Sequence, residues 1–293
     1  MGGVPRKALK EGLSIVGRAT GHRSGAVTHL STESEIVQPV DDDHTFSTLT
    51  RNRPAVSVII PLHNEEFVVA GIVAKLLDEL NEFNIEIEFL LCENGSKDQT
   101  RGIASKLASE HASIRLVLND HRSYGEALRS GIREARGELL IIFNADLFSK
   151  RFFKDSITLL ANGYDIVVGS KRFCRGLDHR PWLRRAITAS FNIFLKFAFG
   201  FSGTDTHGMK ALRRSRILDI CSTCQTFNEV FDTELILRAQ HAGLKICELP
   251  VEVRDIRPPR LSLLARIPST VRDLWTIGRN LKRPHQTEIR KSR

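Results

Sequence analysis

The sequence lacks long apolar runs. No stretch of about 18 or more consecutive apolar residues occurs in its 293 residues, so we expect no membrane-spanning helix. The amino-terminal region also has no apolar segment of the kind that secretory signals contain, so we expect no such signal.

Cysteine is scarce as well. The chain has five cysteines, an odd number, which favours a reducing compartment and excludes a disulfide framework. Cys221 and Cys224 form a CxxC motif, but no second pair or histidine pair follows at a spacing suited to zinc. We therefore interpret this motif as helix packing.

Two common phosphate-binding motifs, GxGxxG and GxxxxGK[ST], are also absent. The formal charge of the chain is +9, and the excess lies at one end, since residues 254–293 hold 11 Lys/Arg against 3 Asp/Glu. Because no nucleic-acid-binding module is recognisable, nucleic acid is not an expected partner. A positive end on a nearly neutral body indicates contact with phosphates, on a substrate or on an anionic membrane surface.

Three regions are predicted along the chain. Residues 1–53 show no sustained apolar period and are expected to be a flexible extension. Residues 54–262 alternate short apolar runs with helical patterns, which predicts one α/β domain with a mostly parallel sheet and helices on both faces. Residues 263–293 are predicted to be a basic tail with an amphipathic helix. Within the domain, strands are expected over 56–60, 87–92, 114–118 and 139–143, and helices over 65–80, 97–109 (capped by Ser96) and 124–135.

Polar and acidic residues follow three of these strands. His63 and Glu65 follow the first, Glu93 follows the second, and Asn144 and Asp146 follow the fourth. Parallel sheets bind ligands beyond the carboxyl ends of their strands. Such residues often serve only as caps and turns, but three sets at one sheet edge favour a ligand site.

Seven consecutive motifs resemble the inverting GT-A glycosyltransferases of family 2, and most of all the dolichyl- or polyprenyl-phosphate sugar transferases. Together they cover residues 55 to 262 in the same order. They are VSVIIPLHNEE (56–66), ENGSKDQT (93–100), YGEALRSGIREARGE (124–138), IIFNADL (141–147), DIVVGSKRF (165–173), GTDTHGMKALRR (203–214) and FDTELILRAQHAGLKICELPVEVR (231–254). The resemblance implies a GT-A (Rossmann-like) fold and a GDP- or UDP-sugar donor bound over the strand ends.

The resemblance also implies roles for individual residues. The nucleotide is expected at Pro61, His63, Glu65, Leu91 and Glu93, and the diphosphate with Mg²⁺ or Mn²⁺ at Asn144, Ala145 and Asp146, of which Asp146 and Asn144 would be the metal ligands. Basic residues near the diphosphate would be Lys171, Arg254 and Arg260, with Arg257 as an alternative register. Asp205 and Gly208 match the acceptor-side motif.

The chemistry of sugar transfer suits these residue types. A departing nucleotide diphosphate carries negative charge, which a hard cation and Arg/Lys side chains can balance. A lipid phosphate acceptor carries roughly −1.5 charge near neutral pH and needs positioning more than a base. A hydroxyl acceptor would need a carboxylate base such as Asp205 or Asp232.

The sequence departs from the family pattern at the metal motif. Asn144 stands where the first Asp of a DxD-like motif is usual, and Phe148 stands where a polar ligand is often found. Glu93 also replaces an Asp, and Asn94 is neutral. These departures weaken the expected metal site and leave open a degenerate scaffold that binds nucleotide without catalysis.

Two segments bear on the acceptor. Residues 181–201 hold five phenylalanines, Trp182 and the Arg184–Arg185 pair, which suits either a core helix beneath the acceptor loop or an interfacial helix. We expect a polyprenyl or dolichyl phosphate acceptor and a peripheral protein on the cytoplasmic face of a membrane, where the basic tail contacts anionic lipid. A soluble hydroxyl or glycan acceptor is the alternative.

Overall fold

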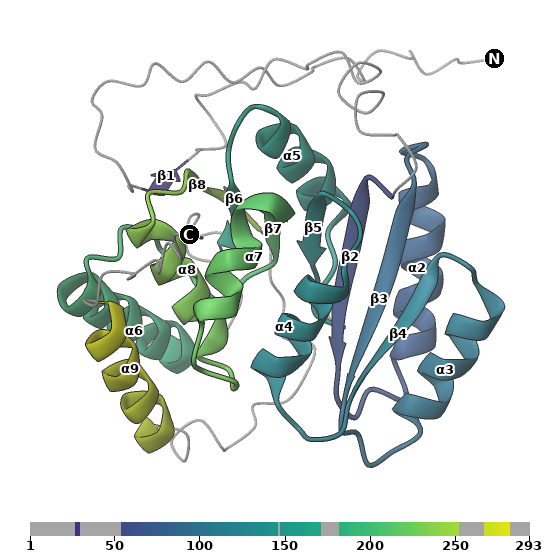
Figure 1. The fold of residues 1–293 in the computed structure, drawn as a ribbon, viewed down its shortest axis with the longest axis horizontal. Coiled ribbons are helices and arrows are strands. Elements are labelled where there is room, and N and C mark those ends of the chain that lie inside the picture. Colours follow the sequence, from purple (N-terminus) through teal and green to yellow (C-terminus); the bar gives the residue numbers. More distant parts are fainter. Residues whose placement is uncertain (1–26, 30–53, 146, 171–181, 252–266, 282–293) are drawn as a thin grey trace, which may run out of the picture.

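The computed structural model describes residues 27–29, 54–145, 147–170, 182–251 and 267–281 (Figure 1). Its centre is an eight-stranded sheet with the strand order β1-β8-β6-β7-β5-β2-β3-β4. All neighbouring pairs are parallel except those of β7, which runs antiparallel to both β5 and β6. The strands are β1 Val27–His29, β2 Val56–Leu62, β3 Ile87–Asn94, β4 Ile114–Asn119, β5 Leu139–Ile142, β6 Ile166–Ser170, β7 Lys210–Arg213 and β8 Ile246–Pro250.

Helices cover both faces of the sheet, as the alternating sequence pattern predicts. One face carries α2, α3 and α5, and the other carries α4, α7 and α8, with α6 and α9 beyond them (Figure 1). The helices are α2 Val69–Asn81, α3 Thr100–Glu110, α4 Tyr124–Glu134, α5 Lys150–Ala161, α6 Trp182–Phe199, α7 Arg214–Thr223, α8 Phe231–His241 and α9 Ile267–Leu281.

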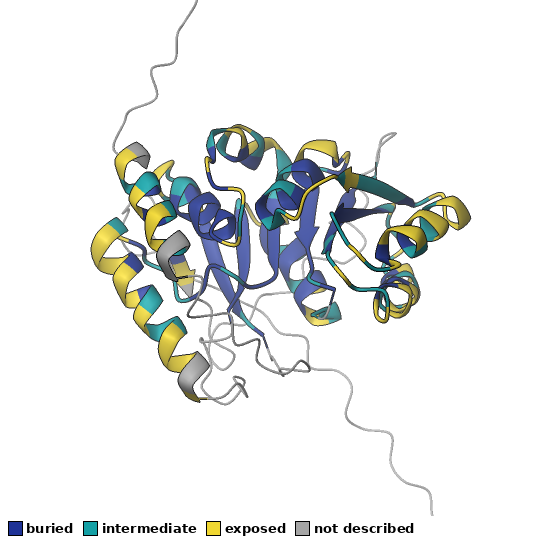
Figure 2. Cartoon of the chain, turned by 90° about the horizontal axis from the view of Figure 1, so that it is seen from below, coloured by how far each residue is buried: buried dark blue, intermediate teal, exposed yellow. Residues whose placement is uncertain are grey.

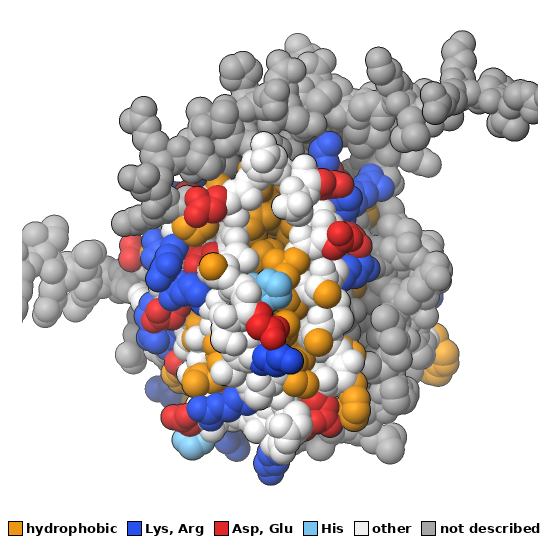
Figure 3. All heavy atoms as spheres, turned by 90° about the vertical axis from the view of Figure 1, so that its right-hand side faces the viewer, with side chains coloured by type: hydrophobic (Ala, Val, Ile, Leu, Met, Phe, Trp, Pro, Cys, Tyr) orange, Lys and Arg blue, Asp and Glu red, His pale blue; other side chains and the backbone are white. Residues whose placement is uncertain are grey.

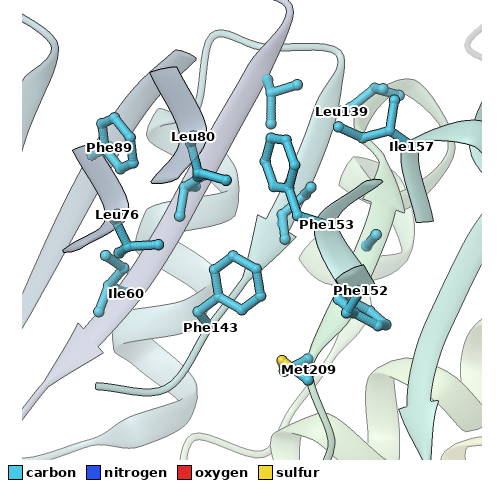
Figure 4. Close-up of a cluster of buried hydrophobic side chains, with 14 of the residues drawn as sticks. Ile60, Leu76, Leu80, Phe89, Leu139, Phe143, Phe152, Phe153, Ile157 and Met209 are labelled. Atoms are coloured by element: carbon cyan, nitrogen blue, oxygen red, sulfur yellow. The ribbon is translucent and has the colours of Figure 1, made fainter. Parts of the chain in front are cut away.

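The strands are apolar on both faces because both faces are covered. In β2, Val58 and Ile60 enter the core under α2, α3 and α5, whereas Ile59 between them enters the core under α4 and α8. Figure 4 shows the first core, where Phe143 and Phe152 pack edge to face with ring centroids 6.4 Å apart. This two-sided burial fixes the register of the strands, and with it the residues that reach the sheet edge.

Two helices begin later than the sequence pattern predicts. α2 begins at Val69 and α3 at Thr100, whereas helices were expected from residues 65 and 97. Ser96 does not cap α3, because its hydroxyl accepts a hydrogen bond from the backbone N–H of Asn64. The carboxylate of Asp98 instead accepts the backbone N–H of Thr100. The residues before each helix form hydrogen bonds that join the loop after β2 to the loop after β3.

Two described elements lie near the ends of the chain. Within the segment expected to be a flexible extension, Val27–His29 forms β1 and pairs with β8. The basic carboxyl-terminal segment contains α9, which packs Leu274 and Ile277 into the core. None of the described helices is long and apolar enough to cross a bilayer. The boundaries at residues 53 and 262 fall beside or inside undescribed segments and stay predictions.

Candidate functional site

Two loops at the carboxyl ends of β2 and β3 are joined by hydrogen bonds. The side-chain oxygen of Asn64 accepts the N–H of Lys97 at 2.9 Å, which links the first loop to the second. The backbone of Asn64 has a positive φ of 55°. The N–H of Glu65 donates to the hydroxyl of Thr100 at 2.7 Å. These bonds hold the segments 63–66 and 93–100 as one rigid surface at the sheet edge.

Charged side chains strengthen this connection. Asp98 accepts the N–H of Glu66 at 3.3 Å, and Glu66 accepts the N–H of Gln99 at 3.0 Å. Partial burial alone would raise the pKa of Asp98, but the hydrogen bonds from Thr100 and Glu66 outweigh it and hold this pKa below its usual value. Asp98 is therefore ionised and structural at neutral pH.

His63 has a defined orientation in the joined loops. Its Nδ1 lies 2.8 Å from the carbonyl oxygen of Asn94, and its Nε2 lies 3.3 Å from the amide nitrogen of Asn64. Because a carbonyl oxygen only accepts, Nδ1 carries the hydrogen and Nε2 accepts. The ring is thus held between the two loops, at the position where the family resemblance implies a contact with the nucleotide.

The other residues expected at the nucleotide are buried to different degrees. Glu93 is 1% exposed, and its carboxylate accepts the N–H of Ser96 at 2.6 Å. Pro61 and Glu65 are partly exposed, whereas the side chain of Leu91 lies wholly in the core. Gly95 has φ +59°, and a Cβ there would lie 2.9 Å from the backbone of His121, so only glycine fits this turn.

A tight turn follows β5 at the same edge. Asn144 and Leu147 form an antiparallel bridge, with the N–H of Leu147 donating to the carbonyl of Asn144 at 3.0 Å. Asn144 is partly exposed and Ala145 is buried. Asp146, between them and Leu147, lies outside the described residues.

The donor set suits only a weakly held metal ion. Across the described ranges, no three His, Cys, Asp or Glu side chains gather in a way that could hold a metal. Asn144 offers one neutral amide oxygen. Mg²⁺ and Mn²⁺ prefer several oxygen ligands, so a cation at this turn would need oxygen ligands beyond that of Asn144.

The expected basic residues Lys171, Arg254, Arg257 and Arg260 also lie outside the described residues. The strands that lead to them are neighbours, because β6 and β8 are parallel and Ser170 pairs with Pro250. Both strands therefore end side by side at the edge that carries the joined loops.

The acceptor-side segment, residues 203–208, reaches this edge from the opposite direction. It precedes β7, in which Lys210 pairs with Ile142 of β5. Gly208 packs directly on Gly169 of β6, where an added Cβ would lie 1.8 Å from a carbonyl oxygen. The antiparallel strand thus brings the segment beside the turn that contains Asn144.

Glu248 of β8 fixes the start of this segment. Its carboxylate accepts the N–H of Thr204 at 2.6 Å, the hydroxyl of Thr204 at 2.5 Å and the N–H of Asp205 at 3.3 Å. Asp205 is 3% exposed and accepts the N–H of His207 at 2.9 Å. The backbone of the segment is therefore determined by buried carboxylates.

Asp232, at the start of α8, forms a buried ion pair. Its Oδ1 lies 3.0 Å from Nζ of Lys210, its Oδ2 accepts the hydroxyl of Tyr124 at 3.1 Å, and both charged side chains are shielded from solvent. Nζ of Lys210 also donates to the carbonyl of Gly208 at 2.9 Å. Lys210 and Glu248 were not singled out from the sequence, although Glu248 is the one charged residue of β8 and a buried charge is rare without a partner.

This chain is similar in sequence to several glycosyltransferases. The relatives include a dolichyl-phosphate hexose transferase of Haloferax volcanii, 27% identical over 73% of this chain and 86% of the relative. A dolichyl-phosphate beta-glucosyltransferase of Dictyostelium discoideum is 27% identical over 75% and 74%. Glycosyltransferase AglD of H. volcanii is 28% identical over 80% of this chain, which spans only 39% of that relative.

Solved structures share the fold. Glucosyl-3-phosphoglycerate synthase from Mycobacterium tuberculosis, in complex with Mn²⁺, UDP-glucose and phosphoglyceric acid, matches with a TM-score of 0.62 and 16% identity over 86% of this chain and 87% of that chain. The expected GT-A fold is thereby confirmed. The sequence model described as Glycosyl transferase family 2 matches residues 57–221. This chain belongs to glycosyl transferase family 2.

Proposed function

We propose that this glycosyltransferase moves a sugar, with inversion, from a nucleotide-diphosphate sugar to a polyprenyl or dolichyl phosphate. The observation that carries the proposal is the meeting of two loop systems at one sheet edge. The loops after β2, β3 and β5 approach from one direction, and residues 203–208 approach from the other, beside Asn144. Two substrates can therefore meet there, and relatives named for dolichyl-phosphate sugar transfer match most of this chain.

The donor would lie over the joined loops. His63, Glu65 and Glu93 would seat the nucleoside, and Asn144, Ala145 and Asp146 would face the diphosphate. Lys171, Arg254 and Arg260, with Arg257 as the alternative, would balance its charge. Mg²⁺ or Mn²⁺, when bound, would supply further charge at the diphosphate. UDP and GDP donors both suit this proposal, and UDP occurs in the M. tuberculosis complexes.

The acceptor would approach residues 203–208. A phosphate acceptor is already a charged nucleophile, so it needs alignment more than proton removal. This agrees with Asp232, whose charge is taken up by Lys210 at 3.0 Å. Asp205, held by Glu248 and His207, would position the acceptor side of the site. The lipid acceptor would place the protein at the cytoplasmic face of a membrane as a peripheral protein.

A donor and acceptor panel tests the proposal. We expect turnover of a UDP- or GDP-sugar that requires both polyprenyl phosphate and a divalent cation. Asp146→Ala should abolish transfer, whereas Asp78→Ala, an exposed acidic residue on α2, should leave it unchanged. Transfer that needs only a soluble glycan would establish the alternative acceptor. Nucleotide binding without turnover of any donor would establish a non-catalytic scaffold.

A further inference from the structure

The outer side of α6 exposes large apolar side chains near both ends of the helix. Trp182, Ile193 and Phe197 share one side of the helix, with 77%, 56% and 84% of their surfaces exposed. Leu195 and Asn192 are buried on the opposite side. Several exposed large apolar side chains on one side of a helix mark an interaction surface more often than a solvated helix.

α9 extends this surface. Val271 and Trp275, one helical turn apart, are 59% and 62% exposed, whereas Leu274 and Ile277 face the core. A Cβ added to Gly278 would lie 3.3 Å from the ring of Phe199, so the two helices are in close contact. Figure 2 shows them side by side with their exposed sides outward. We call this surface the α6–α9 face, made of Trp182, Ile193, Phe197, Val271 and Trp275.

Exposed basic side chains lie on the same two helices as these apolar residues. α6 contains two arginines and a lysine but no acidic residue, and its Arg185 and Lys196 are exposed. On α9, Arg272 and Arg279 are exposed, and the guanidinium of Arg279 lies 4.5 Å from the ring centroid of Trp275. The single acid, Asp273, accepts a hydrogen bond from Asn228 at 2.5 Å.

The opposite end of the molecule has a different surface. There, over α2, α3 and β4, positive and negative side chains are interspersed (Figure 3), and pairs such as Lys75–Glu79 and Lys106–Glu110 stand one helical turn apart. The α6–α9 face thus combines predominantly positive charge with exposed aromatic rings, whereas the charges over α2, α3 and β4 are mixed. A self-paired interface between two copies would bring these like charges together.

We propose that the α6–α9 face binds an anionic lipid bilayer. The inference rests on the proposed function, because membrane binding through this face would bring the site to a lipid acceptor. Tryptophan and phenylalanine rings enter the boundary between headgroups and acyl chains, and arginine and lysine meet the lipid phosphates.

The inner side of the same helix supports the acceptor segment. The side-chain amide of Asn192 donates to the carbonyl of Thr204, and the ring of Phe191 lies 6.0 Å from that of His207. Because a helix is about 10 Å across, a bilayer on the outer side of α6 lies within one helix diameter of residues 203–208. The contact would therefore set the depth at which the lipid phosphate meets the site.

Vesicle sedimentation of the full chain tests the inference. The probes are phosphatidylcholine vesicles with and without phosphatidylglycerol. We expect wild-type protein to bind the anionic vesicles, and Phe197→Ser/Trp275→Ser to bind them about tenfold more weakly, because burial of two aromatic side chains is lost. Leu118→Ser, at an exposed leucine of β4, is the matched control and should bind as wild type does. Both variants change exposed residues and should keep the fold.

Several outcomes would overturn the inference. Equal vesicle binding by the double variant and wild type would show that the basic tail alone binds the membrane. A wild-type dimer that the double variant dissociates, without a change in vesicle binding, would assign the face to a second copy. Capture of a soluble protein through this face, with no vesicle binding, would assign it to that protein.

A separate readout distinguishes this inference from the proposed function. Vesicle binding needs neither nucleotide nor acceptor, so it can succeed even where no polyprenyl phosphate is glycosylated, and only the proposed function would then fail. If both hold, the double variant should keep transfer to a short-chain, water-soluble prenyl phosphate and lose most transfer to a long-chain acceptor in vesicles.

Discussion

Nζ of Lys210 lies 3.0 Å from Oδ1 of Asp232, and both side chains are almost completely shielded from solvent. The pair joins β7 to α8, and a hydrogen bond from the same ammonium group to Gly208 joins both to the acceptor segment. A buried charge without its partner is strongly unfavourable. The pair therefore couples the stability of the fold to the shape of the site.

Lys210→Met should lower the free energy of unfolding by about 3–5 kcal/mol, because Asp232 is left as an uncompensated buried charge. Lys210→Met/Asp232→Leu should recover much of this loss, since neither charge then remains. Denaturant titration followed by circular dichroism measures both values. A loss below about 1 kcal/mol for the single variant would contradict the buried pair.

Glu248→Gln should impair the acceptor side of the reaction selectively. The amide retains one acceptor oxygen for the three donors of Thr204 and Asp205, so the segment loses part of its support. We expect a several-fold higher KM for polyprenyl phosphate with the affinity for nucleotide unchanged. Steady-state kinetics and calorimetry with UDP or GDP separate the two. Glu110→Gln on α3 is the control, and equal loss of both affinities would indicate general destabilisation.

Asn144→Asp should increase the affinity of the site for the metal ion. A second carboxylate near Asp146 adds a charged oxygen ligand where the wild type has a neutral one. We expect the Mn²⁺ concentration needed for half-maximal nucleotide binding to fall by about tenfold, roughly 1.4 kcal/mol. Titration of Mn²⁺ at fixed nucleotide measures this. An unchanged or higher requirement would place the metal away from Asn144.

Glu88 should stabilise the fold in a pH-dependent way. Burial raises the pKa of its carboxyl, but hydrogen bonds from Ser57, Arg136 and Arg115 outweigh burial and lower it. The stabilisation is thus fully present above the unfolded pKa of about 4.3 and is lost as pH falls through the lower folded pKa.

Glu88→Gln should therefore destabilise the protein by about 1–3 kcal/mol at pH 7 and by progressively less below about pH 4. Urea titrations across this range measure the difference between variant and wild type. A difference that grows on acidification would show that the folded pKa is raised instead.

The buried cysteines should react slowly with alkylating reagents. Burial raises the pKa of Cys92 to about 12 and that of Cys221 to about 11, so little thiolate is present at pH 8. Both are free thiols, as are Cys224 and Cys247. Mass spectrometry after iodoacetamide treatment should find these four unmodified in native protein and modified after unfolding. Rapid native labelling of Cys221 and Cys224 would contradict their role in packing.

The sequence was informative where structure is local. The apolar runs of β2, β3 and β5 predicted the sheet, and the polar residues that follow them occupy one edge, as expected for parallel strands. The start of α3 was not predictable in this way, because Ser96 has two uses. A serine before a helical pattern predicts a cap. The hydroxyl of Ser96 accepts the N–H of Asn64 instead, and that contact depends on how the two loops lie in space.

Contacts distant in sequence were the least predictable part of the site. Glu248 meets Thr204 across 44 residues, and no periodicity relates the two. Lys210 lies in a four-residue strand that also contains Arg213, so the strand's composition does not mark it as buried, and its partner depends on how α8 packs against β7. The exposure of α6 was likewise undetermined, since the same aromatic residues suit a core helix and a surface helix.

The reversed direction of β7 has a consequence for how this enzyme can change. Because β6 and β7 are antiparallel neighbours, the segment that connects them, here called the excursion, leaves the sheet and returns to it at the same edge. That excursion contains both α6 and residues 203–208. From residue 182 onward, its length and composition can vary without displacing any strand or any residue expected to hold the donor. Exchange of residues 182–209 between relatives, which leaves Lys171 in place, is thus a route to a new acceptor with an unchanged donor.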